Sequence, residues 1–333
     1  MAATECNIKN LFFPVELRPI YWRRSLGLFA DESSPTDWEY FNLERFSAVF
    51  DTQADFAFSV VTNDSYCLIS NETAYNLGID VAKYVFSIEG KEDFISKGYI
   101  TPNKAACHMW IMRRIEQNQP EILRGWKAAV YVENSYNKTR AFKVSAGFRN
   151  DIYNADFLIK SIAPDLKVPH DSAPDEIKQL IFSVEGFKKV KYSALEKEFQ
   201  AKIVKLKSLR IAKMDVLPLG CKYFNLIKKP GMNKSKLEKL ADSLSQLYQL
   251  IPEHFKSSNG SGYDLLELFM HYNNEMSLLN NELKGTLGHL GTWTEDFIKQ
   301  ASNPDYQVTE FAKKEAIDTA SWFERTHVNG NSW

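Results

Sequence analysis

The residues best suited to contact a ligand gather on one short stretch, from Asn134 to Asn150. This stretch combines hydroxyl, amide and cationic side chains, which are the groups that bind phosphate oxygens, and arginine adds a bidentate fork. Tyr131 and Tyr136 add rings that can stack on bases. Ordinary hairpin turns with a solvated face remain open as the alternative. The residues predicted to contact nucleic acid here are Ser135, Tyr136, Lys138, Thr139, Arg140, Lys143 and Arg149.

A second candidate surface is a lysine-rich segment from Phe187 to Lys239. It carries fifteen Lys and Arg side chains against four carboxylates, a net charge of +11, so the rest of the chain carries −12 of the total charge of −1. This separation exceeds what a mixed, solvated surface needs. The alternatives are a solvated helix, or an interface with the acidic part of a neighbouring copy. Phosphate contacts are predicted for Lys188, Lys189, Lys191, Lys202, Lys205, Lys207 and Arg210.

The spacings that define common catalytic and metal sites are absent. There is no P-loop, HExxH, GxSxG or EF-hand pattern, and the four cysteines never stand at CxxC spacing. We therefore predict no catalytic residue, no metal site and no cofactor. His271 and Glu275, one helical turn apart with Asn274 adjacent, could belong to a site, but they are interpreted as a polar helix face. A metal-dependent nuclease using Glu133, Asp151 or Asp156 remains as a further alternative.

Three strands must position the first candidate surface. Between residues 126 and 159, apolar and polar residues alternate with a period of two, and asparagine-rich turns interrupt them at 134–138 and 149–151. The pattern predicts a three-stranded antiparallel meander with one apolar face and one polar, cationic face.

Upstream of the meander, the sequence predicts a hairpin and two helices. Residues 56–61 and 66–69 form the hairpin, one helix begins at Ser70 or Asn71, and another runs from Thr101-Pro102 to about Asn118. The first 55 residues are expected to be irregular. Within them, Tyr21-Trp22-Arg23-Arg24 could stack on bases, although we expect this segment to pack on the domain.

Beyond Pro164 helical spacing dominates. One helix opens with a capping box at Ser193 and directs Leu195, Phe199, Ile203 and Leu206 inward, and another opens at Ser235. Residues 257–262 are expected to be flexible. The fold class is therefore α+β, with a region from 1 to 165 around the central meander (126–160) and a mainly helical region from 166 to 333 that carries the basic segment. Further helices are expected at 177–184, 263–283 and 309–325, with a helix break at 285–291.

The turn after the first meander strand resembles a motif of an uncharacterised family of phage and plasmid proteins, domain of unknown function 932. Lys138 stands where that family usually has a glycine, and a cysteine that often follows its arginine is absent. The resemblance implies a mobile-element origin and a bacterial cytoplasm, and it carries no activity. The matching residues are Asn134-Ser135-Tyr136-Asn137, Thr139, Gly147-Phe148-Arg149 and Asn154, with Tyr66–Glu72 and His271–Asn274 similar to flanking segments.

These features predict a non-catalytic nucleic-acid-binding protein of a phage or plasmid. It would act in DNA replication or recombination by binding or annealing single strands, and it would form a homo-oligomer. The alternative is a phage protein that docks on a host protein, or self-assembles, through its oppositely charged parts. No leader or membrane-length apolar run is present, so we expect a cytoplasmic protein without a membrane partner. The four cysteines are expected to be buried, reduced thiols: Cys6, Cys67, Cys107 and Cys221.

Overall fold

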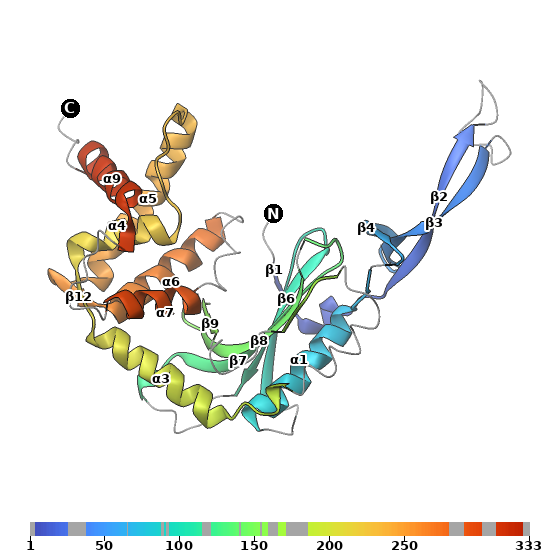
Figure 1. Cartoon of the computed structure of the whole chain (residues 1–333), viewed down its shortest axis with the longest axis horizontal. Helices are drawn as coiled ribbons and strands as arrows, with labels where there is room; N and C mark the ends of the chain where they lie inside the picture. Colours follow the sequence, from blue (N-terminus) through green and yellow to red (C-terminus); the bar gives the residue numbers. More distant parts are fainter. Residues whose placement is uncertain are drawn as a thin grey trace. The chain divides into compact units, whose positions relative to one another are not determined.

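The chain folds as an α+β protein of antiparallel sheets and helices (Figure 1). It divides into two compact units, the first comprising residues 1–115, 128–147 and 160–192, and the second 116–127, 148–159 and 193–333. The units therefore interleave along the chain, whereas the sequence suggested one division near residue 165. The computed structural model describes residues 4–25, 38–64, 66–87, 90, 93–114, 121–139, 141–153, 155–158, 166–170, 186–279, 290–301 and 311–328.

The largest sheet contains the predicted meander. Its strand order is β1-β5-β6-β7-β8-β10, and β9 also pairs with β8, so the three strands expected between 126 and 159 are confirmed. The chain passes between the two units within β7 and β8. The bounds are β1 Thr4–Cys6, β5 Phe94–Ile100, β6 Ala106–Arg113, β7 Trp126–Ser135, β8 Phe142–Asn150, β9 Ala155–Leu158 and β10 Leu166–Val168.

The helix predicted from Thr101 is wrong, because residues 106–113 form strand β6 between β5 and β7. Both sides of this strand are buried, with Met109 and Ile111 on one side and Trp110 and Met112 on the other. A strand covered on both faces loses its alternation, so the apolar run fits either period. Thr101 instead begins the turn between β5 and β6, where its Oγ1 accepts the Ala106 N–H at 3.0 Å.

Helix α1 (Asn71–Phe86) is confirmed and begins at Ser70, whose side chain accepts the Thr73 N–H at 3.1 Å. It packs closely on β6 and β7, since a Cβ at Gly78 would collide with Val132 and Ile111. The hairpin predicted between residues 56–61 and 66–69 is wrong. Residues 66–69 form no strand, and residues 56–62 form β4, which pairs with β3 instead.

A separate three-stranded sheet precedes α1 and contains β2 (Val15–Ser25), β3 (Trp38–Asp51) and β4 (Phe56–Thr62). Its base joins a buried cluster of Phe13, Val49, Val61, Tyr66 and Tyr136. The expectation of an irregular N-terminal segment is therefore wrong. The outer parts of β2 and β3 extend as a two-stranded ribbon (Figure 1), and this ribbon has no buried face that would impose alternation.

Helices dominate the described residues from 192 onward. The inward face predicted for α3 is confirmed, because Leu195, Phe199, Ile203 and Leu206 are fully buried. The elements here are α3 Tyr192–Ser208, β11 Arg210–Ala212, α4 Lys213–Tyr223, α5 Lys234–His254, β12 Asn259–Ser261, α6 Gly262–Leu279, α7 Leu290–Ala301 and α9 Lys314–Phe323. Short 3-10 or π turns occupy Ile8–Leu11, Glu121–Leu123 and Glu324–Val328.

Two local predictions in this half need correction. The cap of α5 is Asn233, whose side chain accepts the Lys236 N–H at 3.0 Å, rather than Ser235. The segment expected to be flexible contains β12, which pairs with β11. The predictions for 177–184 and for residues 285–289 of the helix break lie outside the described residues, and the break is wrong at Gly291, which lies within α7. No described helix combines the length and hydropathy needed to cross a membrane.

Candidate nucleic-acid interface

A group of exposed lysines lies where α5 begins. We call Lys228, Lys229, Lys234, Lys236 and Lys239 the lysine cluster, and all five are exposed. They occupy the connection from α4 and the first turns of α5. Only one carboxylate, Glu238, stands between residues 225 and 240, and its Oε1 lies 3.9 Å from the Lys234 Nζ. The cluster therefore presents several ammonium groups to solvent.

The position of the lysine cluster is electrostatically unfavourable for the isolated protein. A helix N-terminus carries about half a positive charge and is stabilised by acidic side chains. The first turn of α5 has no acidic residue, and two lysines, Lys234 and Lys236, stand there instead. Oriented N–H groups and neighbouring ammonium groups together attract anions, so this end of α5 is suited to phosphate.

The lysines that the sequence predicted to contact phosphate divide between the two units. Lys188, Lys189 and Lys191 are exposed and belong to the first unit. The Lys188 Nζ lies 5.3 Å from the centre of the Tyr84 ring, at cation–π distance. These three residues and the lysine cluster therefore stand in different units, and each group is a separate candidate for phosphate.

The spacing of Lys202, Lys205 and Arg210 along the helix expected from Ser193 predicts a cationic stripe on its outer face, and this stripe is only partly present. Lys202 is engaged by Glu198 at 3.1 Å and its side chain is only 14% exposed. Lys205 and Lys207 are exposed, and the Lys207 Nζ lies 5.0 Å from the centre of the Tyr263 ring. Arg210 is exposed but belongs to β11, because α3 ends at Ser208. The prediction of one continuous helical stripe is wrong.

The expected polar, exposed face of the meander is wrong for three of its residues. Ser135, Tyr136 and Arg149 are each about 1% exposed. Tyr136 packs against Phe13 and Phe58, with ring centres 5.8 and 5.3 Å away, and its burial raises the pKa of its hydroxyl. Lys138 and Thr139 are exposed in the turn, Lys143 is half-buried, and Arg140 lies outside the described residues.

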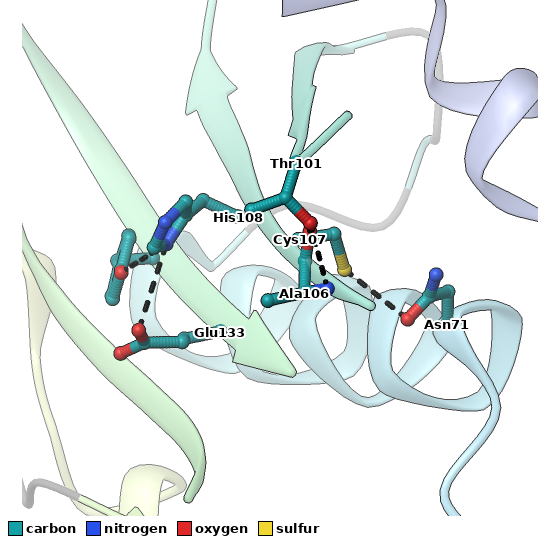
Figure 2. A network of polar contacts seen from close by, with 7 residues as sticks. Asn71, Thr101, Ala106, Cys107, His108 and Glu133 are labelled. Atoms are coloured by element: carbon teal, nitrogen blue, oxygen red, sulfur yellow. Dashed lines mark hydrogen bonds and ion pairs between the residues drawn. The ribbon is translucent and has the colours of Figure 1, made fainter. Parts of the chain in front are cut away.

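The turn residues that resemble the phage family instead hold the start of α1. Asn134 donates from Nδ2 to the Asn71 Oδ1 at 2.8 Å and to the Ile69 carbonyl at 2.9 Å. Cys107 donates to the same Asn71 oxygen at 3.1 Å (Figure 2). The Tyr136 hydroxyl accepts the Asn71 N–H at 2.9 Å. These contacts give Asn134 and Tyr136 a structural role.

The two described carboxylates of the nuclease alternative, Glu133 and Asp151, each lie next to a different basic side chain. Glu133 lies 3.8 Å from His108 Nδ1, which also lies 2.6 Å from the Tyr131 hydroxyl (Figure 2). Asp151 pairs with Lys127. Glu133 and Asp151 belong to different units, and the side chain of Asp156 lies outside the described residues.

The ribbon formed by β2 and β3 is a further candidate surface. Its outer part exposes Tyr21, Trp22 and Tyr40 by 53–56% and Phe41 by 38%. Trp22 and Phe41 pair across the strands with ring centres 5.5 Å apart. The Arg23 guanidinium lies 4.3 Å from the centre of the Trp38 ring. The expectation that this segment packs on the domain is wrong.

Exposed apolar side chains concentrate on this sheet. Of thirteen large apolar side chains that the described part of the chain exposes, nine lie on β2, β3 or β4. Aromatic and arginine side chains are the residues that dominate interfaces, and they also form platforms on which unpaired bases stack. We call Tyr21, Trp22, Arg23, Tyr40 and Phe41 the aromatic ribbon.

The lysine cluster lies within the basic segment, but no site was predicted there, although its five lysines stand in the sequence beside a single carboxylate. The exposure of the aromatic ribbon had no sequence signal, because rings at these positions suit a core equally well. No family model, curated protein or solved structure matches this chain.

Proposed function

We propose that the protein binds nucleic acid without performing chemistry on it, as a phage or plasmid protein of DNA replication or recombination. The observation that carries the proposal is the lysine cluster, in which five exposed lysines occupy the connection before α5 and the first turns of this helix. Binding of a polyanion would reduce the electrostatic repulsion between the helix N-terminus and the lysines beside it. The mobile-element setting rests on the resemblance of residues 134–154.

Single-stranded nucleic acid is the expected ligand. The aromatic ribbon offers rings that stack on bases only when the bases are unpaired, and such stacking contributes about 1–3 kcal/mol per base with little sequence preference. The lysine cluster, which belongs to the other unit, is a separate candidate for phosphate contacts, and these carry no sequence information either. Binding should therefore be weakly sequence-specific and should favour single strands over duplexes.

The test is a fluorescence anisotropy titration of a labelled single strand with the full chain. The triple variant Lys234→Glu, Lys236→Glu and Lys239→Glu should weaken binding by about 100-fold or more, because it removes three phosphate contacts and adds three repulsive charges. Lys256→Glu, Lys299→Glu and Lys314→Glu form the matched control, since these lysines are equally exposed outside the cluster. Equal loss in both triple variants would show that only net charge matters and would refute this site.

A second candidate function is docking on another protein, either a host protein or a second copy. The aromatic ribbon favours it, because a long apolar, arginine-bearing ribbon has the composition of an interface. Light scattering after size exclusion, with and without oligonucleotide, separates the two. If the wild-type chain is an oligomer, and Trp22→Ser with Phe41→Ser makes it monomeric without lowering the affinity for the oligonucleotide, the ribbon serves self-association.

A further inference from the structure

A group of metal-ligand side chains lies where the end of α5 faces α6. The Nε2 of His254 is 3.1 Å from the Nδ1 of His271, and the Oε2 of Glu253 is 3.9 Å from the same Nδ1. One ligand atom from each residue lies within 4.8 Å of the others. Elsewhere in the described part of the chain, no three His, Cys, Asp or Glu side chains come together in this way.

The distances between these atoms suit a tetrahedral ion. Zinc binds imidazole nitrogen at about 2.0–2.1 Å, which places neighbouring ligand atoms roughly 3.3 Å apart. The observed separations of 3.1 and 3.9 Å lie on either side of that value. The ligand atoms of Glu253 and His254 also lie within 4.8 Å of each other.

A fourth residue sets the orientation of His271. The Oε1 of Glu275, one turn further along α6, lies 3.3 Å from the Nε2 of His271. A carboxylate only accepts hydrogen bonds, so it favours the tautomer with the proton on Nε2 and leaves the Nδ1 lone pair directed at His254 and Glu253. Proteins use this carboxylate–histidine arrangement to orient metal ligands.

The surroundings leave the group accessible from one side. The Tyr153 ring lies 5.6 Å from the His271 ring and 6.4 Å from the His254 ring, measured between centres, and so flanks both. The two histidines are half-buried, whereas the Glu253 side chain is 62% exposed. An ion can therefore enter beside Glu253 while the imidazoles stay fixed between the helices.

We propose that Glu253, His254 and His271 bind one divalent transition metal ion of the zinc class, with Glu275 positioning His271. Two imidazoles and one carboxylate select zinc, nickel or copper over magnesium and calcium, which prefer oxygen ligands. Because His254 ends α5 and His271 lies within α6, the bound ion links these two helices. Three protein ligands leave a fourth position for water.

The experiment uses the untagged full chain, freed of metal by a chelator and dialysed. Calorimetric titration with zinc chloride should show one saturable equivalent, whereas magnesium chloride at the same concentrations should show none. Zinc should also raise the Tm of the wild-type chain, because it binds the folded state. His254→Gln and His271→Gln should each lose the saturable equivalent and the Tm increase.

Matched carboxylate variants keep the test valid if a histidine variant does not fold. Glu253→Gln should weaken zinc binding strongly, and Glu275→Gln should weaken it by about 10- to 100-fold. Glu238→Gln is the control, because it lies on the same helix and its side chain is also 62% exposed, and it should bind zinc like the wild type. Absence of saturable zinc binding by the wild type, or unchanged affinity in Glu253→Gln and Glu275→Gln, would overturn the proposal.

Discussion

At the residue scale, Asn71 is the point where three chain segments meet. Its side chain receives hydrogen bonds from Asn134 and Cys107, donates to the Leu11 carbonyl at 3.1 Å, and is 2% exposed. Its N–H is satisfied by the Tyr136 hydroxyl. Buried polar groups are costly when they lose a partner, so this network fixes where α1 begins relative to β7.

Tyr136→Phe tests whether this tyrosine is structural or binds a ligand. The change removes the acceptor of the buried Asn71 N–H, so the free energy of unfolding should fall by about 1–3 kcal/mol. Urea denaturation measures the fall, with the exposed Tyr40→Phe as a control that should change stability little. Affinity for a single strand should stay at the wild-type value. A loss of affinity at unchanged stability would restore Tyr136 to the interface.

The thiols provide a second residue-scale prediction. Cys67, Cys107 and Cys221 are buried, and burial raises the pKa of each thiol, to about 12 for Cys221. Since the thiolate is the reactive form, these three should resist iodoacetamide at pH 8 in the native protein and react in denaturant. Cys6 is half-buried and should react first. Mass spectrometry counts the labels, and rapid native labelling of Cys107 would contradict the packed network.

At the element scale, the sequence predicted elements that have one buried face and misjudged those that do not. The predicted inward positions of α3 and the alternation of β7 agree with the structure, because one side of each meets the core and the other is more polar. In β8 the polar residues Ser145 and Arg149 are buried as well, so its expected polar side is not exposed. Strand β6 has no polar side and was predicted as a helix. The outer part of the β2–β3 ribbon has no buried side and was predicted as irregular.

The candidate site shows the same limit. Net charge identified the basic segment, but it could not show that Lys202 is engaged by Glu198 while Lys236 stands exposed at a helix start. The pairing of His254 with His271 also had no sequence signal, because 17 residues separate them and only the packing of α5 on α6 brings the rings together. Which side chains are exposed and which come together depends on contacts between elements, and the pattern within one element does not show these contacts.

The start of α5 allows a prediction in which stability and affinity change in opposite directions. Lys236 is the third residue of the helix after the cap Asn233, where glutamate forms a capping box. Lys236→Glu should therefore raise the free energy of unfolding by about 0.3–1 kcal/mol, through the helix dipole. The same change should weaken binding of a single strand, because it replaces a phosphate contact with a repulsive charge.

Lys256→Glu is the control for this change, because Lys256 is exposed and lies just after α5. It should lower stability slightly, because a helix C-terminus favours a cation over an anion, and it should leave affinity unchanged. Chemical denaturation and anisotropy on the same preparations give both quantities. A Lys236→Glu variant that is less stable, or that binds as tightly as the wild type, would remove the functional explanation for lysines at this helix end.

At the scale of the whole molecule, a net charge of −1 conceals a basic segment of +11 and a remainder of −12. An overall neutral protein attracts a polyanion only through local charge, because the Debye length is about 8 Å at physiological salt. The lysine cluster, with one carboxylate among five lysines, is dense enough to act over that distance. Binding should consequently depend on local contacts and respond steeply to salt.

The salt dependence of affinity counts those contacts. If the five lysines of the cluster each meet one phosphate, the slope of log K against log salt should be roughly −3.5 for a single strand, since each contact contributes about −0.7. Between 50 and 200 mM salt, affinity should then fall by about 100-fold. Replacing Lys234, Lys236 and Lys239 by glutamine should reduce the magnitude of the slope by about 2, whereas glutamine at Lys256, Lys299 and Lys314 should leave it unchanged. A slope near zero in the wild type would mean that stacking on the aromatic ribbon, rather than phosphate contact, holds the strand.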